Sequence, residues 1–392
     1  MAVAASVLFL FARLLCPDIA FADGNMAPSS TDDYVLGRDL YLTLSIENMP
    51  GAVKHLRRAV EIDPTNLRAW YTLAETYRTG MLMATTDVSK WKKESQKIRD
   101  FLVNLSSDPK RAAGYDPSIL TDLAARTKGS AAIDLGNWTD AEAILRRKKV
   151  LESDSELNKG RDISYGVFLF GVGRISDAEN VLTRARVADR YAGVIYSHLA
   201  RVYAAMNDYE RSLAILAEGM NLFTDSKTDV EQRWHPLLRR SALFTALATR
   251  DKGLIAAKAD SIKDSDLGAG HLDKKLASLL TDGQALKRTL DEMWSDPVNQ
   301  HGYRAESIAI WAAYAGHNDL ALSALNHLPN DLAAPALWHP VMANIRNTSG
   351  FRNLVQETGL LNYWLNSGEW SEFCRPVGTH DFECTASTRR AG

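Results

Sequence analysis

Bulky and small apolar residues recur in this chain in one fixed order, and only a helix places that order on a single face. The first copy consists of Trp70, Leu73, Ala74 and Tyr77. The second copy consists of Tyr196, Leu199, Ala200 and Tyr203. Intervals of three and four residues put side chains on the same side of a helix, where a small residue lets a second helix approach closely. We therefore predict that all eight residues are structural core.

Weaker copies of the pattern keep their turn residues. Helix-turn-helix signals lie at 136–138, 173–175, 207–209 and 316–318. The stretch 231–291 has helical periodicity but fits the pattern poorly, which predicts degenerate hairpins, and 81–115 predicts an insertion or an extended helix. Alternating strand patterns are almost absent, so the fold class is predicted to be all-α.

These segments resemble the tetratricopeptide repeat (TPR) family. Ala52, Leu56, Ala59 and Pro64 add the second helix and closing proline of a preceding repeat. The resemblance implies a TPR-type α-solenoid of stacked antiparallel helical hairpins over 33–330, followed by a C-terminal helical cap and tail over 331–392. Such stacks curve into a concave groove.

The resemblance also implies which side chains face the groove. They are Arg68, Tyr71, Glu75, Arg78, Arg126, His198 and Arg201. Arginines in a groove can bind carboxylates through paired hydrogen bonds. We therefore expect a non-catalytic scaffold that binds a protein or peptide partner, the alternative being that these residues form solvated helix faces.

Composition and motifs argue against other classes of function. Forty-six Lys and Arg stand against 48 Asp and Glu, so no overall basic field favours nucleic acid. The sequence contains no HExxH, phosphate-binding glycine-rich loop, GxSxG or paired CxxC motif. We expect neither an enzyme nor a cofactor. A remote alternative is a metal-dependent hydrolase in which the scattered histidines converge, namely His235, His271, His301, His317, His327 and His339.

The N-terminus predicts export. Residues 2–12 form an apolar run, and Ala20-Phe21-Ala22 has small residues where a signal peptidase cleaves. We predict a signal peptide or membrane anchor over 1–22 and a polar linker over 23–32. The protein is then periplasmic or exported, or tethered to the inner membrane through its N-terminus.

Three cysteines divide between the two ends of the chain. Cys16 leaves with a cleaved signal, whereas Cys374 and Cys384 remain close together in the last segment. In an oxidising compartment these two are expected to form a disulfide. Two unrelated thiols are the alternative, and a zinc site with His380 is less favoured.

The tail resembles a second, narrower group of proteins. The segments Phe373–Gly378 and Asp381–Cys384 resemble the C-terminal end of bacterial TPR regulators that carry a winged-helix DNA-binding domain or a class III nucleotide cyclase domain. No such output domain fits in the residues before the repeats. The resemblance implies an alternative function, a sensory or regulatory module that acts on a membrane-bound transcription regulator or nucleotide cyclase.

Overall fold

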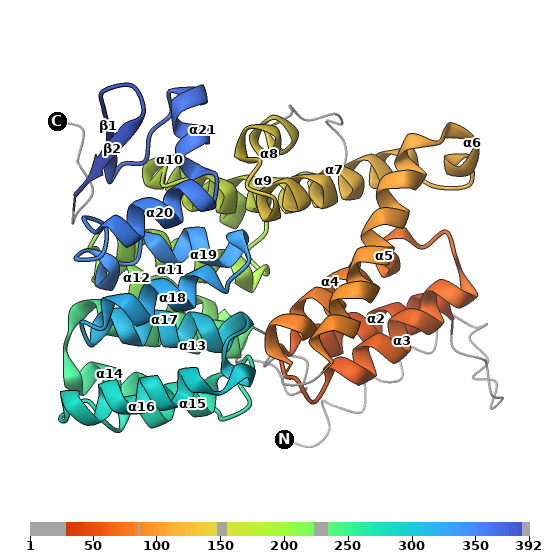
Figure 1. Ribbon diagram of the computed structural model, residues 1–392. Coiled ribbons are helices and arrows are strands. Elements are labelled where there is room, and N and C mark those ends of the chain that lie inside the picture. Colours follow the sequence, from red (N-terminus) through yellow and green to blue (C-terminus); the bar gives the residue numbers. More distant parts are fainter. Residues whose placement is uncertain (1–28, 85–86, 147–154, 223–233, 386–392) are drawn as a thin grey trace, which may run out of the picture.

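The computed structural model describes residues 29–84, 87–146, 155–222 and 234–385, so the predicted signal or anchor segment and Cys16 lie outside the described residues. The described chain is mostly α-helical (Figure 1). In chain order its helices are α2 (Ser30–Leu42), α3 (Met49–Ile62), α4 (Leu67–Met83), α5 (Val88–Ser107), α6 (Pro109–Ala112), α7 (Pro117–Asp134), α8 (Trp138–Leu145), α9 (Ser155–Gly171), α10 (Ile175–Ala188), α11 (Gly193–Ala205), α12 (Tyr209–Leu222), α13 (His235–Thr249), α14 (Lys252–Asp260), α15 (Gly270–Ala277), α16 (Gly283–Ser295), η2 (Pro297–Asn299), α17 (Gly302–Tyr314), α18 (Asn318–Asn326), α19 (Asn330–Leu337), η3 (Pro340–Met342), α20 (Ser349–Glu357) and α21 (Leu360–Ser367). The prediction of a mostly helical chain is confirmed.

Successive helices pack in pairs, as the sequence pattern predicted. Four of the pairs share one kind of turn, centred on Gly136, Gly173, Asn207 and Gly316, each with a positive φ. In every case the N–H of this residue donates to the carbonyl three residues earlier, and the N–H of the next residue donates to the carbonyl five residues before itself. These two bonds satisfy the last carbonyls of the first helix and reverse the chain, and glycine or asparagine tolerates the left-handed backbone that they need.

The region between the first two strong copies contains a long helix. α5 has 20 residues and is followed by the short α6. This agrees with the extended helix predicted for 81–115. The described part of the stretch 231–291 forms α13 to α15 and most of α16, and these helices contact one another in sequence. At the N-terminal end, α2 begins at Ser30 inside the predicted linker, because Ser29 and Asp32 form a capping box.

The chain folds back on itself. α17 packs against α4, α13 and α15, α19 packs against α7 and α9, and α21 packs against α8. In Figure 1 these C-terminal helices (blue) lie beside earlier parts of the chain. In a simple linear stack each helical pair contacts only its neighbours. Here helices more than a hundred residues apart in the sequence are in contact.

Buried apolar side chains form two large clusters. One is built from α3, α4, α5 and α7, between Leu56 and Leu123. The other contains residues from Ile133 to Cys384. α17 is buried on all sides within the second cluster, with Trp311 fully inaccessible to solvent. The C-terminal helices are therefore a part of the core and not an appended segment.

The tail contains the one departure from an all-helical fold within the described residues. β1 (Cys374–Val377) and β2 (Asp381–Cys384) form an antiparallel hairpin, where a helical cap and tail had been expected. Each strand has four residues, which is too short for alternation to stand out from the sequence. Phe382 and Cys384 point inward from β2. No helix in the described ranges has the length and apolar character that a membrane span requires.

Candidate functional site

The residues predicted to face a groove lie on α4, α7 and α11, and two of them, Arg78 and Arg201, bind carboxylates of the chain's own C-terminal helices. Arg68 is exposed, whereas Tyr71 and Arg78 on α4 are half-buried. The guanidinium of Arg126 lies 4.5 Å from the ring centre of Tyr71. Burial raises the pKa of the Tyr71 hydroxyl, which therefore stays protonated.

Arg78 joins α4 to α19. Its Nη1 donates to Oδ2 of Asp331 at 2.5 Å, and its Nε lies 3.4 Å from Oε2 of Glu75. The side-chain amide of Asn330 donates to the carbonyl of Ile133 at the end of α7. These contacts anchor the start of α19 against α4 and α7.

Arg201 joins α11 to α17. Its Nη2 donates to Oε1 of Glu306 at 3.0 Å, while Nη1 of Arg240 donates to Oε2 of the same carboxylate at 2.6 Å. Burial raises the pKa of Glu306, but Arg240 and Arg201 outweigh it and hold that pKa below its usual value. Burial together with Arg201 lowers the pKa of His198 to about 3. His198 is therefore neutral, and both predicted groove residues lie within the folded core.

The residues predicted as repeat core are mostly buried. Leu73, Ala74 and Tyr77 are buried on α4, as are Tyr196, Leu199 and Ala200 on α11. Trp70 and Tyr203 are half-buried. The indole N–H of Trp70 donates to the carbonyl of Pro64, and its ring packs against Phe101.

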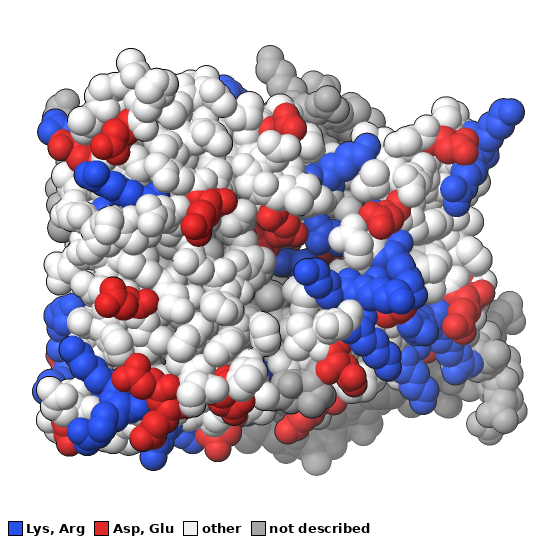
Figure 2. Space-filling model, in the orientation of Figure 1, with Lys and Arg blue, Asp and Glu red and all other residues white. Residues whose placement is uncertain are grey.

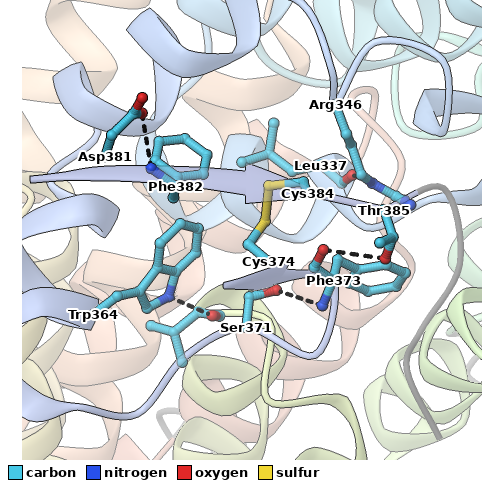
Figure 3. Close-up of a disulfide and its surroundings, with 11 residues drawn as sticks. Leu337, Arg346, Trp364, Ser371, Phe373, Cys374, Asp381, Phe382, Cys384 and Thr385 are labelled. Carbon is cyan, nitrogen blue, oxygen red and sulfur yellow. Dashed lines mark hydrogen bonds between the residues drawn. A yellow bond between two sulfur atoms is a disulfide. The ribbon is translucent and has the colours of Figure 1, made fainter. Parts of the chain in front are cut away.

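Cys374 and Cys384 form a disulfide that joins the ends of β1 and β2 (Figure 3). Phe382 packs edge-on against Trp364, whose indole N–H donates to the carbonyl of Val172. The hairpin therefore packs on α21, which in turn contacts the turn between α9 and α10.

A cavity of about 510 Å³ lies where α4 and α5 meet the start of α17. Its walls come from α4, α5 and the end of α7 on one side, and from the start of α17 and the connection between α18 and α19 on the other. Its ionisable lining residues are Arg78, Lys92, Arg99, Asp134, His301 and His327. Figure 2 shows Lys and Arg side chains gathered over α5 and the adjoining part of α4.

Arg99 is the deepest charge of the cavity wall. The residue is 8% exposed, and its contacts are 3.5 Å to the Asp134 carboxylate and 3.5 Å to the carbonyl of Thr127. A guanidinium has five N–H donors. Among the described residues, these two long contacts leave most of the donors of Arg99 without a partner.

Asp134 is the one acidic residue of the lining. Burial raises its pKa to about 6, the carboxylate of Asp331 adds to the rise, and Arg78 and Arg99 oppose it. Unfolded aspartate titrates near 4, so between about pH 4 and 6 the folded state binds more protons. Stability contributed by this group is therefore lost as the pH rises through that window.

Replacing Asp134 by asparagine should stabilise the protein above pH 6 and make no difference near pH 4. The gain should be about 1 kcal/mol, less than the full shift implies because a third of the side chain is exposed. Urea denaturation at pH 4.5 and 7.5 measures it. Asp260→Asn, at an exposed position on α14, should change neither value. A loss of stability at pH 7.5 in Asp134→Asn would contradict this account.

Histidines do not gather into a metal site in the part of the chain that the structure describes, where no group of three or more candidate ligands occurs. His339 is buried and contacts the carbonyl of Phe244, and His317 contacts Asp291. His301 and His327 lie at the cavity, where Nδ1 of His327 donates to the carbonyl of Ser323.

Sequence reasoning named Arg78, His301 and His327 for other roles but missed Lys92, Arg99 and Asp134 of this cavity. Lys92 and Arg99 belong to a stripe on α5 that also contains Val88, Ser89, Ser95 and Gln96. Their helical spacing places them on one face, which was a readable signal. The opposite wall comes from residues more than 160 positions away, and local spacing contains no information about it. Comparison with family models, curated proteins and solved structures finds no match to this chain.

Proposed function

We propose that this chain is a non-catalytic scaffold of TPR-type helical hairpins that binds an acidic segment of a protein or peptide partner on the basic face of α5. We define the basic face as Lys90, Lys93 and Lys97, which helical spacing places on one side of α5. All three lysines are exposed, and the first two have no ion-pair partner among the described residues. This unpaired charge on one helix is the observation that supports the proposal.

The neighbouring acidic residues do not neutralise this face. Glu94 contacts Lys97 and also Arg57 of α3. The carboxylate of Asp100 accepts a hydrogen bond from Gln96. The formal charge of the whole chain is only -2, so the positive charge of α5 is a local feature and not a reflection of overall composition. A surface of this kind speeds the encounter with an acidic partner and favours it over neutral ones.

The basic face is favoured over the predicted groove because carboxylates of the chain itself already bind two of the groove arginines. Arg78 binds Asp331, and Arg201 binds Glu306. A partner carboxylate could reach these arginines only if α17 and α19 left the core. α5 requires no such rearrangement. The repeated turns and sequential helix pairs support the TPR-type interpretation, and an oxidising compartment would preserve the Cys374–Cys384 disulfide.

Charge reversal on α5 tests the proposal. Fluorescence anisotropy with a labelled peptide rich in aspartate and glutamate should show binding that weakens with added salt. The double variant Lys90→Glu, Lys93→Glu should bind at least about tenfold more weakly, because two attractions become repulsions.

The matched control is Lys252→Glu, Lys275→Glu, which makes the same change in net charge at exposed positions on α14 and α15. It should bind like the unmodified protein. Equal losses in the two double variants would contradict a specific face. Equal affinity for a DNA strand of the same charge would argue against a protein partner.

A second candidate function is regulation of a membrane-bound winged-helix transcription regulator or nucleotide cyclase. The supporting observation is that the tail which resembles such regulators is integral to the fold, with Phe373 and Phe382 both buried. Co-purification with a regulator encoded beside this gene tests it. A complex that survives Lys90→Glu, Lys93→Glu would place the regulator on another face.

A further inference from the structure

The cavity beside α5 has the size and the walls of a small-molecule site. Its volume of about 510 Å³ lies within the range of about 300 to 1,000 Å³ that is usual for ligand pockets. Its walls come from helices far apart in the sequence, α4, α5 and α7 on one side and the start of α17 on the other. It is distinct from the outward stripe of α5 that contains Lys90 and Lys93.

Positive charge dominates the polar lining. Arg78, Lys92 and Arg99 are cationic, and Asp134 is the acidic residue that lines the cavity. Arg78 is paired with Asp331, but Lys92 has no ion-pair partner among the described residues and Arg99 has only two long contacts. The remaining donors of Arg99 are open to the cavity, and an anionic oxygen ligand would supply acceptors for them through charge-assisted hydrogen bonds.

The start of α17 adds to the same field. Gly302 lines the cavity, and His301 before it makes no side-chain capping bond. The first N–H groups of a helix lack partners within the helix and attract anions. This feature reinforces the site that the arginines and Lys92 form.

We propose that this cavity binds a small molecule bearing a doubly charged anionic group, either a phosphate or a pair of carboxylates. Arg99 binds the anion at the inner end, Lys92 contacts it from α5, and the start of α17 faces it from the opposite wall. The site goes beyond the proposed scaffold function and does not depend on it. A ligand here would contact both walls of the cavity and would stabilise the fold by mass action.

Asp134 makes the binding depend on pH. Its carboxylate repels an anion, and the pKa of about 6 means that this repulsion disappears as the pH falls below 6. The groups that face it are Arg99 on α5, Arg78 on α4 and Asp331 on α19. His301 and His327 also line the cavity.

Isothermal titration calorimetry on the full chain tests the site. Inorganic phosphate is the probe for a phosphate ligand, succinate is the probe for a pair of carboxylates, and glycerol is the neutral control. Phosphate or succinate should bind saturably and glycerol should not. Arg99→Gln should weaken binding by about tenfold or more, since one charge-assisted contact is lost. Lys92→Gln, at an exposed position, should weaken it as well, and it keeps the test valid if Arg99→Gln fails to fold.

Two further variants sharpen the test. Lys93→Gln, the exposed neighbour that does not line the cavity, should leave the affinity unchanged. Asp134→Asn should bind the dianions more tightly than the unmodified protein at pH 7.5. The pH dependence is measured with sulfate, which stays a dianion. The affinity of the unmodified protein for sulfate should rise between pH 7.5 and 5.5, and this rise should be much smaller in Asp134→Asn. Absence of saturable binding for both dianions, or an equal loss in Lys93→Gln and Lys92→Gln, would overturn the proposal.

Discussion

Replacing Glu306 by glutamine should destabilise the protein by about 3 to 5 kcal/mol, the usual cost of breaking a buried ion pair from one side. Glu306 is fully buried on α17 and accepts hydrogen bonds from Arg201 on α11 and Arg240 on α13. Glutamine keeps the shape but not the charge, so two buried guanidinium groups lose their common counter-ion. Urea denaturation monitored by circular dichroism measures the change.

Glu292→Gln is the matched control, because Glu292 is exposed on the neighbouring helix α16. Its effect should be within about 0.5 kcal/mol, as for most surface substitutions. A loss below about 1 kcal/mol in Glu306→Gln would mean that α17 is not held between α11 and α13 in the way described here.

Replacing Trp338 by alanine should have an effect of similar size, about 3 to 5 kcal/mol. Trp338 is completely buried, stacks on Phe373 of the tail at 5.4 Å between ring centres, and donates its indole N–H to the carbonyl of Gly171. Its loss leaves a cavity where the tail, the end of α19 and the end of α9 meet. The free energy of unfolding from urea titration checks the value.

Trp70→Ala provides the comparison for this variant. Trp70 is half-buried and packs on Phe101 at the edge of the smaller apolar cluster. It therefore has less apolar area to lose, and its substitution should cost clearly less than that of Trp338. The opposite order would show that the tail contributes little to the fold.

The helix pairs could be predicted from the sequence because their determinants are local. A turn such as 136–138 needs a glycine at one position and apolar residues on the helices at either side, and both are visible within a short stretch. The full burial of α17 also left a signal that was not used. The segment 305–315 is small or apolar on nearly every face, which is typical of a helix surrounded by protein.

The candidate site could not be predicted in the same way. Arg78 and Asp331 are 253 residues apart, and Arg201 and Glu306 are 105 apart. The resemblance to TPR repeats implied that Arg78 and Arg201 face a groove, but it could not show that the chain itself supplies their carboxylates. The cavity beside Arg99 has the same origin, since it exists only where the C-terminal helices return to α4 and α5.

Hydrogen–deuterium exchange of the full chain tests most directly whether α17 is buried against α4, α13 and α15. The account predicts that amides of α17 are among the slowest to exchange, and that an acidic peptide adds protection to α5 but none to α17. Exchange in α17 as fast as in an exposed turn, or new protection there when the peptide binds, would contradict it.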